Sequence, residues 1–131
     1  MERVVRLVTP GSKLLVNVGD TIKVEVAFTY QGPAWRETLY SALYKRTLGM
    51  VDEVSGGAGS MGWDISKADV PSPVTGCYVL VPVPNRPGET FGIYAKLGNI
   101  LSSYYDNVIE VSGVAAPIVT NFKVTGYAKV V

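Results

Sequence analysis

Residues 21–30, Thr-Ile-Lys-Val-Glu-Val-Ala-Phe-Thr-Tyr, decide the fold of this chain. Apolar side chains occupy every second position, and this two-residue period predicts a strand that is buried on one face. One strand cannot bury its apolar face alone, so it needs a second sheet, and the sequence therefore predicts an all-β sandwich. We expect Val26 and Phe28 to be buried, and Phe28→Ala to cost roughly 3–5 kcal/mol through the cavity it leaves.

Length and composition limit the class of protein. The 131 residues suffice for one hydrophobic core. The 14 glycines and 8 prolines, together with many Val, Thr and Tyr residues, favour strands and turns over helices. The net charge is +1 and neither sign forms a run, which argues against a nucleic-acid partner because such partners need clustered Lys and Arg. No stretch approaches the roughly 20 apolar residues of a membrane-spanning helix, so we expect no membrane insertion.

Further segments are expected to be strands, in chain order 3–8, 13–18, 76–83, 90–97 and 104–111. Residues 37–47 are ambiguous, because their apolar side chains fit both a strand and a helix that Pro33 could open. We favour a strand, since neighbouring strands supply its pairing partners.

The segments between these strands carry turn and loop signals. Residues 55–61, Ser-Gly-Gly-Ala-Gly-Ser-Met, are expected to form the most mobile internal loop because they are rich in glycine. Residues 64–73 are expected to continue as irregular chain, since Pro71 and Pro73 block a helix. The turn signal at 85–88 predicts that the strands on either side of it, 76–83 and 90–97, form a hairpin.

The chain is expected to divide into a sandwich module at residues 1–112, a linker at 113–117 and a C-terminal strand within 118–131. The linker is proposed because Ser-Gly-Val-Ala-Ala-Pro follows the last strand of the sandwich. Residues 121–131 are again β-prone. They either close the same sandwich or begin a following module, and the sequence leaves both alternatives open.

Four short segments carry a resemblance to a known family: Gly-Asp-Thr-Ile-Lys-Val-Glu-Val at 19–26, Gly-Pro-Ala at 32–34 with Thr-Leu-Tyr at 38–40, Gly-Ile-Tyr-Ala-Lys at 92–96, and Asn-Val-Ile-Glu-Val at 107–111. The pattern resembles immunoglobulin-like modules, of the adhesion-related type, in prokaryotic cell-surface and phage proteins. The resemblance implies an immunoglobulin-like antiparallel sandwich of about seven strands with an extra C-terminal strand. It also implies a spacer or interaction unit, often in tandem, in an extracellular, cell-surface or virion location. The Cys…Trp…Cys arrangement of antibody domains is missing, so no antibody-like recognition follows.

The residue types of common active sites are scarce. Histidine is absent, which excludes Ser-His-Asp and Cys-His catalysis and the usual zinc sites. Asp52, Glu53, Asp64 and Asp69 could serve a carboxylate-dependent hydrolase or bind Ca²⁺, but their spacing is more typical of solvated loop charges. We therefore expect no catalytic residues and no metal site.

Two other features have simple explanations. Gly57, Gly59 and Gly62 match the spacing of a dinucleotide-binding loop, but no helix is expected after them, so we expect no cofactor. Cys77 is the only cysteine, so no intrachain disulfide can form, and its place in an apolar run predicts a small buried side chain.

Aromatic side chains are the clearest functional signal. The chain is rich in them at these positions: Trp35, Tyr40, Tyr44, Trp63, Tyr94, Tyr104 and Tyr105. Exposed rings stack on sugars or dock proteins, whereas most aromatic side chains fill a core. We take Trp35, Trp63, Tyr40 and Tyr44 as the candidate ligand-binding residues, with the two tryptophans the expected exceptions to core packing because both lie beside loop signals.

The sequence thus favours a non-catalytic structural or interaction module whose partners are neighbouring modules or another protein. The alternative is a carbohydrate-binding module that uses exposed aromatic rings. A hydrolase built on Asp52, Glu53 and Asp64 ranks third.

Overall fold

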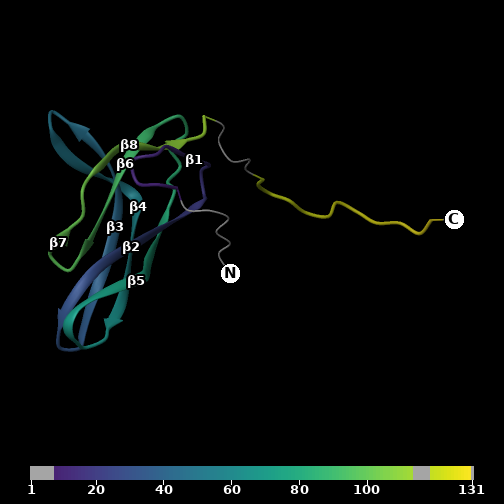
Figure 1. Cartoon of the computed structure of the whole chain (residues 1–131). Coiled ribbons are helices and arrows are strands. Elements are labelled where there is room, and N and C mark those ends of the chain that lie inside the picture. The colour runs from purple at the N-terminus through teal and green to yellow at the C-terminus, as the bar shows by residue number, and fades with distance from the viewer. Residues whose placement is uncertain (1–7, 114–118, 131) are drawn as a thin grey trace.

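Strands make up the regular structure of the chain. The computed structural model describes residues 8–113 and 119–130, and within these residues the backbone forms strands and no helix (Figure 1). In chain order the strands are β1 (Leu14–Val16), β2 (Thr21–Gly32), β3 (Trp35–Thr47), β4 (Met50–Ile65), β5 (Ala68–Pro82), β6 (Thr90–Leu97), β7 (Ile100–Leu101) and β8 (Tyr105–Val111). The all-β class is confirmed, and so is the strand expected at 37–47. Residues 3–7 of the first expected strand lie outside the described residues.

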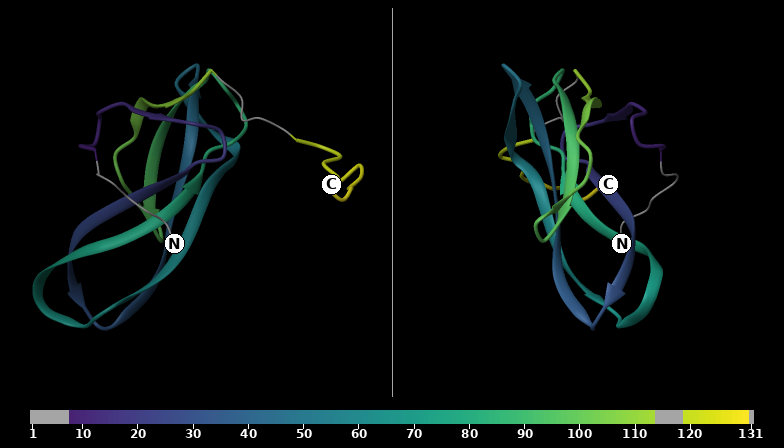
Figure 2. Two further views of the ribbon diagram at one scale, coloured as in Figure 1. Left: turned by 90° about the vertical axis from the view of Figure 1, so that its right-hand side faces the viewer. Right: turned by 60° about the vertical axis from the view of Figure 1, so that its left-hand side comes forward.

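Two sheets pack against each other, as the alternating pattern of residues 21–30 requires (Figure 2). The larger sheet has the order β1-β8-β6-β3-β4, with β7 beside β6, and the smaller sheet consists of β2 and β5. The pairs are antiparallel except for β1 and β8, which run parallel with Leu14 opposite Ile109 and Val16 opposite Val111. Ile22 of β2 lies opposite Val81 of β5, and Val26 lies opposite Cys77.

The hairpin expected between residues 76–83 and 90–97 is wrong. β5 pairs with β2, whereas β6 pairs with β3 and β8. The chain between β5 and β6 therefore crosses from the smaller sheet to the larger one, as connections do in a sandwich of two sheets.

The loop expected at 55–61 is also wrong, because these residues lie within β4. Residues 58–61 pair with β3, for example Gly59 with Ser41, and residues 55–57 lie at an irregularity in the register of the two strands. The high mobility expected for residues 55–61 depended on their forming a loop, so the structure gives no reason to expect it.

The irregular segment expected at 64–73 is equally wrong. β4 ends at Ile65 and β5 begins at Ala68. β5 tolerates its prolines because, among the described strands, it has a ladder partner on one side only, and proline is accepted where no backbone N–H is needed.

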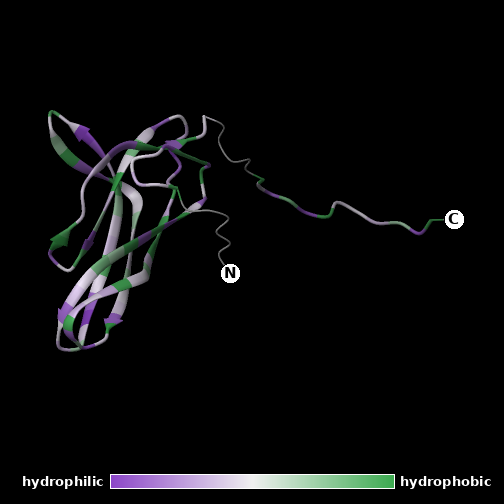
Figure 3. Cartoon of the chain, in the orientation of Figure 1, coloured by the Kyte–Doolittle hydropathy of each residue, from purple (hydrophilic) through white to green (hydrophobic). Residues whose placement is uncertain are grey.

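The C-terminal strand does not form within the described residues. Residues 119–130 run as an extended segment that leads away from the sandwich, and all of them are exposed (Figures 1 and 3). Of the linker proposed at 113–117, only Gly113 lies within the described residues.

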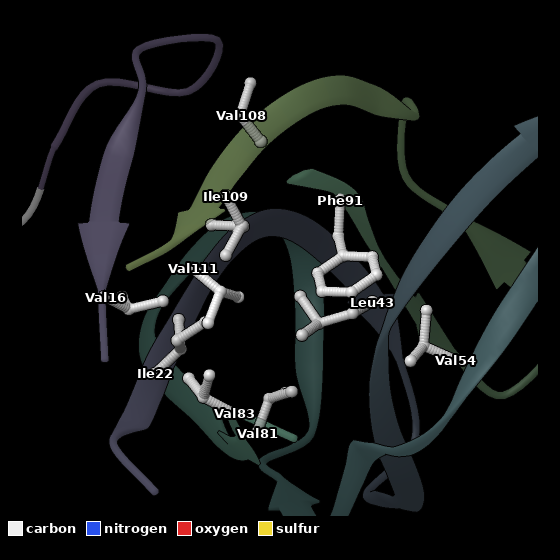
Figure 4. Packing of buried hydrophobic residues seen from close by; sticks show 10 residues of the cluster. All are labelled: Val16, Ile22, Leu43, Val54, Val81, Val83, Phe91, Val108, Ile109 and Val111. Carbon is white, nitrogen blue, oxygen red and sulfur yellow. The ribbon is translucent and has the colours of Figure 1, made fainter. Parts of the chain in front are cut away.

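The core lies between the two sheets in two clusters of buried side chains. The larger cluster comprises Val16, Ile22, Leu43, Val54, Val81, Val83, Phe91, Val108, Ile109 and Val111 (Figure 4). The smaller cluster comprises Leu39, Cys77, Val79 and Ala95, which confirms the buried Cys77. Val26 and Phe28 only pack against the smaller cluster and are half-buried, so their expected full burial is wrong. More buried and more exposed side chains do alternate along most of β2. However, β2 belongs to a sheet of only two strands, so its side chains are covered less completely than those of β3.

Candidate functional site

The candidate aromatic residues do not share one surface. Trp35, at the start of β3, stacks on Tyr30 of β2 with ring centroids 5.6 Å apart and planes 17° apart. Trp63 of β4 packs against the smaller core cluster, and its Nε1 donates a hydrogen bond to the carbonyl oxygen of Tyr78, 2.9 Å away. Both tryptophans are half-buried. Tyr40 and Tyr44 instead pack with the buried Ala42 on the opposite face of β3.

Tyr40 and Tyr44 belong to a group of rings that we call the tyrosine cluster, which consists of Tyr40, Tyr44, Tyr94 and Tyr104. Tyr44 and Tyr104 meet edge to face with centroids 5.4 Å apart, and Tyr94 and Tyr104 lie 4.9 Å apart. Tyr44 is only 1% exposed although it lies on the outer face of the larger sheet. This face therefore carries a second apolar layer of its own.

Gly92 makes room for this layer. A Cβ at this position would lie 2.7 Å from Cε1 of the Tyr44 ring, which is closer than van der Waals contact allows. The glycine of β6 thus lets the Tyr44 ring lie flat against the sheet, and any side chain here would displace the ring.

Two carboxylates hold the hydroxyl groups of the cluster. Glu53 of β4 accepts hydrogen bonds from the hydroxyls of both Tyr40 and Tyr94. Asp106 of β8 accepts from the Tyr44 hydroxyl and from Nε of Arg46, the latter at 2.8 Å. These bonds link the outer faces of β3, β4, β6 and β8.

The surroundings of Tyr40, Tyr44 and Tyr94 raise the pKa of each hydroxyl and keep these three tyrosines protonated. Burial, followed by the hydrogen bond and the charge of Glu53, raises the pKa of Tyr40 to about 12 and also raises the pKa of Tyr94. The pKa of Tyr44 is raised by burial and by Asp106. The pKa of Asp106 is lowered, first by the hydrogen bond from Tyr44 and then by the one from Arg46. Protonated phenols that donate hydrogen bonds to carboxylates are a stable arrangement at neutral pH.

The carboxylates that sequence reasoning linked to hydrolysis are not brought together. Asp52 and Glu53 are neighbours on β4 and so point to opposite faces. Asp64 lies near the far end of the same strand, where it pairs with Arg36 at 2.9 Å and is largely exposed. Asp69 lies on β5 beside Lys67, 3.6 Å away. Within residues 8–113 and 119–130, no group of three or more Cys, Asp or Glu side chains is placed to hold a metal ion.

A small pocket of about 270 Å³ adjoins the tyrosine cluster. Its lining comprises Tyr44, Lys45, Arg46, Thr90, Gly92, Asp106 and Asn107. Sequence reasoning counted the tyrosines but missed Glu53, Arg46 and Asp106 as their partners. The sequence does contain one sign of the cluster. Tyr40, Ala42 and Tyr44 occupy alternate positions, so they lie on one face of β3, the face that points away from the core.

No family model, no curated protein and no solved structure matches this chain. In the part of the chain that the structure describes, no helix is long and apolar enough to cross a membrane.

The tyrosine cluster predicts a loss of stability at alkaline pH. Tyrosines of the unfolded chain ionise near pH 10, whereas Tyr40, Tyr44 and Tyr94 of the folded chain stay protonated to higher pH. Their raised pKa values stabilise the folded state fully below about pH 10, and this contribution is lost as pH rises toward about 12. We expect the Tm to fall between pH 10 and pH 12 by roughly 5 °C or more.

Tyr94→Phe is the control for this prediction. The variant keeps the ring in the cluster but removes one titrating group, so its Tm should fall less steeply over the same pH range. Equal slopes for the variant and the parent chain would contradict the assignment of the alkaline transition to the tyrosine cluster.

Proposed function

We propose that this chain is a non-catalytic structural or interaction module of a larger surface, secreted or viral assembly. The observation that carries the proposal is that seven of the thirteen large apolar side chains exposed among the described residues lie on two elements that project from the sandwich. One is the tip of the hairpin between β3 and β4, and the other is the segment 119–130. Their exposed residues are Leu48, Met50, Val119, Phe122, Val124, Tyr127 and Val130. Projecting apolar groups are typical of surfaces that another protein covers.

The hairpin tip supports an interaction role in a second way. Leu48 is 99% exposed and has a φ of 53°, a left-handed conformation that Asn, Asp or Gly adopts at lower cost in a two-residue turn. A leucine at this position neither packs on the sandwich nor suits the turn. An apolar contact with a partner would account for it.

The strand order supports the immunoglobulin-like part of the proposal. In such domains strands B and E share one sheet, and strands G, F, C and C′ share the other. β2 and β5 correspond to B and E, and β8, β6, β3 and β4 correspond to G, F, C and C′ in that order. The fold would then act as a spacer that presents the projecting elements to a partner.

Carbohydrate binding is the second candidate, and the stacked rings of Tyr30 and Trp35 favour it. Their nearly parallel arrangement, where the chain passes from β2 of the smaller sheet to β3 of the larger one, offers a flat, partly exposed aromatic surface. Trp63 does not extend this surface, because its indole is bonded to Tyr78 and packs on the core.

A tryptophan experiment separates the two functions. For an interaction module, we expect no oligosaccharide to change the tryptophan fluorescence of the chain. We also expect Trp63→Ala to lower the free energy of unfolding by about 2 kcal/mol or more, through lost packing and the lost hydrogen bond to Tyr78. Fluorescence titration against a panel of soluble glycans and urea unfolding of the variant measure the two effects.

Trp35→Ala is the matched variant, since it removes the tryptophan of the stacked pair and leaves Trp63 in place. Saturable glycan binding that is lost in Trp35→Ala, while the urea midpoint stays unchanged, would overturn the proposal in favour of a carbohydrate-binding module.

A further inference from the structure

We propose that residues 119–130 of one copy of this chain add as a strand to the free edge of β2 in a second copy and fill the groove beside it. The inference rests on the proposed function as an interaction module, and it names both the partner and the surface. Two independent features carry it: an apolar segment with nothing to cover it, and an open sheet edge beside an apolar groove.

The segment has the pattern of a strand that is buried on one face. Phe122, Val124, Ala128 and Val130 share one parity, and the intervening positions include Lys123, Thr125 and Lys129. The side chains are almost fully exposed: Phe122 by 92%, Val124 by 80% and Val130 by 93% (Figure 3). A strand with an apolar face is stable only when that face is covered.

The receiving surface is the edge of the smaller sheet. β2 pairs with β5 on one side, and no strand within the described residues pairs with its other side. A groove of about 1170 Å³ runs beside this edge, between the smaller sheet and β1, β6 and β8 of the larger one. The apolar part of its lining includes Leu14, Ile22, Val24, Val26, Ile93, Tyr105, Val108 and Ile109. An unpaired edge offers backbone N–H and C=O groups to an added strand, and the groove offers sites for alternate side chains.

The segment and the edge match in length and charge. Residues 121–130 and residues 21–30 of β2 are segments of equal length. Backbone hydrogen bonds between the two strands could therefore extend over all of residues 21–30, a length of about 33 Å at the usual rise per residue. Residues 119–130 carry Lys123 and Lys129 and no acidic side chain. Asp20 and Glu25 line the groove, and Lys23 is the one basic side chain among the described residues of its lining. The charges therefore favour this pairing over the pairing of two segments with each other.

The direction of the segment favours a second copy over the same chain. Residues 119–130 follow the end of the sandwich where β8 finishes, and they lead away from the body of their own domain (Figure 1). A strand that extends outward reaches the β2 edge of another molecule, and repeated exchange would join copies in a row or close them in a ring.

Analytical ultracentrifugation of the full chain over a range of concentrations tests the association. We expect concentration-dependent dimers or larger species. Val124→Asp should weaken the association by roughly tenfold or more, because it places a charge on the face that enters the groove. Thr125→Asp is the matched control, since it adds the same charge at the adjacent residue on the opposite face and should change the association much less. A full chain that stays monomeric, or equal effects of the two substitutions, would overturn the proposal.

Hydrogen exchange locates the surface. A synthetic peptide of residues 119–131 is added to the full chain carrying Val124→Asp, which keeps its own β2 edge open. We expect the peptide to slow amide exchange along β2. Slowed exchange along the free edge of β4 instead, or protection of residues 119–130 in a monomeric parent chain, would overturn the assignment to β2 of a second copy. None of these outcomes depends on glycan binding or on Trp63, so the inference can fail while the proposed function stands.

Discussion

Gly59→Ala is expected to destabilise the chain by about 3 kcal/mol or more, enough to unfold a marginally stable domain. An added Cβ would overlap the carbonyl oxygen of Leu80 and lie 3.0 Å from its carbonyl carbon. Gly59 is paired with Ser41 in the larger sheet, and Leu80 is paired with Lys23 in the smaller one. Neither backbone can move without breaking its own ladder, so the clash cannot be relieved cheaply.

Gly62→Ala is the matched control on the same strand. Its added Cβ would meet Nη2 of Arg36 at 2.8 Å, which is the far end of a flexible and exposed side chain. We expect a change of about 0.5 kcal/mol or less, because the guanidinium can swing aside. Urea unfolding of the two variants measures the difference. Equal midpoints would show that β4 and β5 do not approach as closely as described.

Gly59 also explains why the sequence misleads at residues 55–61. A glycine gives the backbone conformational freedom, which favours a loop, but it also permits close approach of another strand. Gly59 serves the second purpose, since β4 passes over the backbone of β5 at this point. The local pattern is the same in both cases, so only the position of a strand more than twenty residues away in the sequence distinguishes them.

The pairing partners of the strands could not be predicted from the sequence either. The two-residue period located β2 and β6, and the strands expected at 37–47 and 104–111 were confirmed as β3 and β8. These assignments depend on the local sequence. The partners of each strand depend on contacts that are distant in sequence. β5 follows β4 after a two-residue turn but pairs with β2, and a turn signal cannot reveal such a crossing.

The same reasoning applies to the candidate site. The aromatic residues were identified by type, but their roles depend on which face each side chain occupies. Tyr40 and Tyr44 turned out to share a face with Tyr94, a residue of another strand. Glu53 and Asp106, which bind their hydroxyls, come from β4 and β8. Residues 53 and 106 had no shared feature in the sequence that could have linked them to one cluster.

Phe91→Ala is expected to lower the free energy of unfolding by about 3–5 kcal/mol, the range for a fully buried aromatic side chain. The Phe91 ring is 0% exposed and lies in the larger core cluster with Leu43 and Val54 (Figure 4). Nζ of Lys45 also lies over this ring, 5.3 Å from its centroid, so the substitution removes a favourable cation–π contact as well as packing. Urea unfolding followed by circular dichroism measures the loss.

Phe28→Ala is the comparison that makes this prediction specific. The alternating pattern of β2 predicted that Phe28 is buried and that its removal costs the roughly 3–5 kcal/mol of a core cavity. Its side chain is instead half-buried and packs against the smaller cluster. We therefore expect a cost of about 1–2 kcal/mol, because part of the ring is already in contact with water and the space it leaves opens to solvent. An equal loss of unfolding free energy for Phe28→Ala and Phe91→Ala would contradict this prediction. It would mean that the Phe28 side chain is fully buried in solution and that the core extends beyond the two clusters.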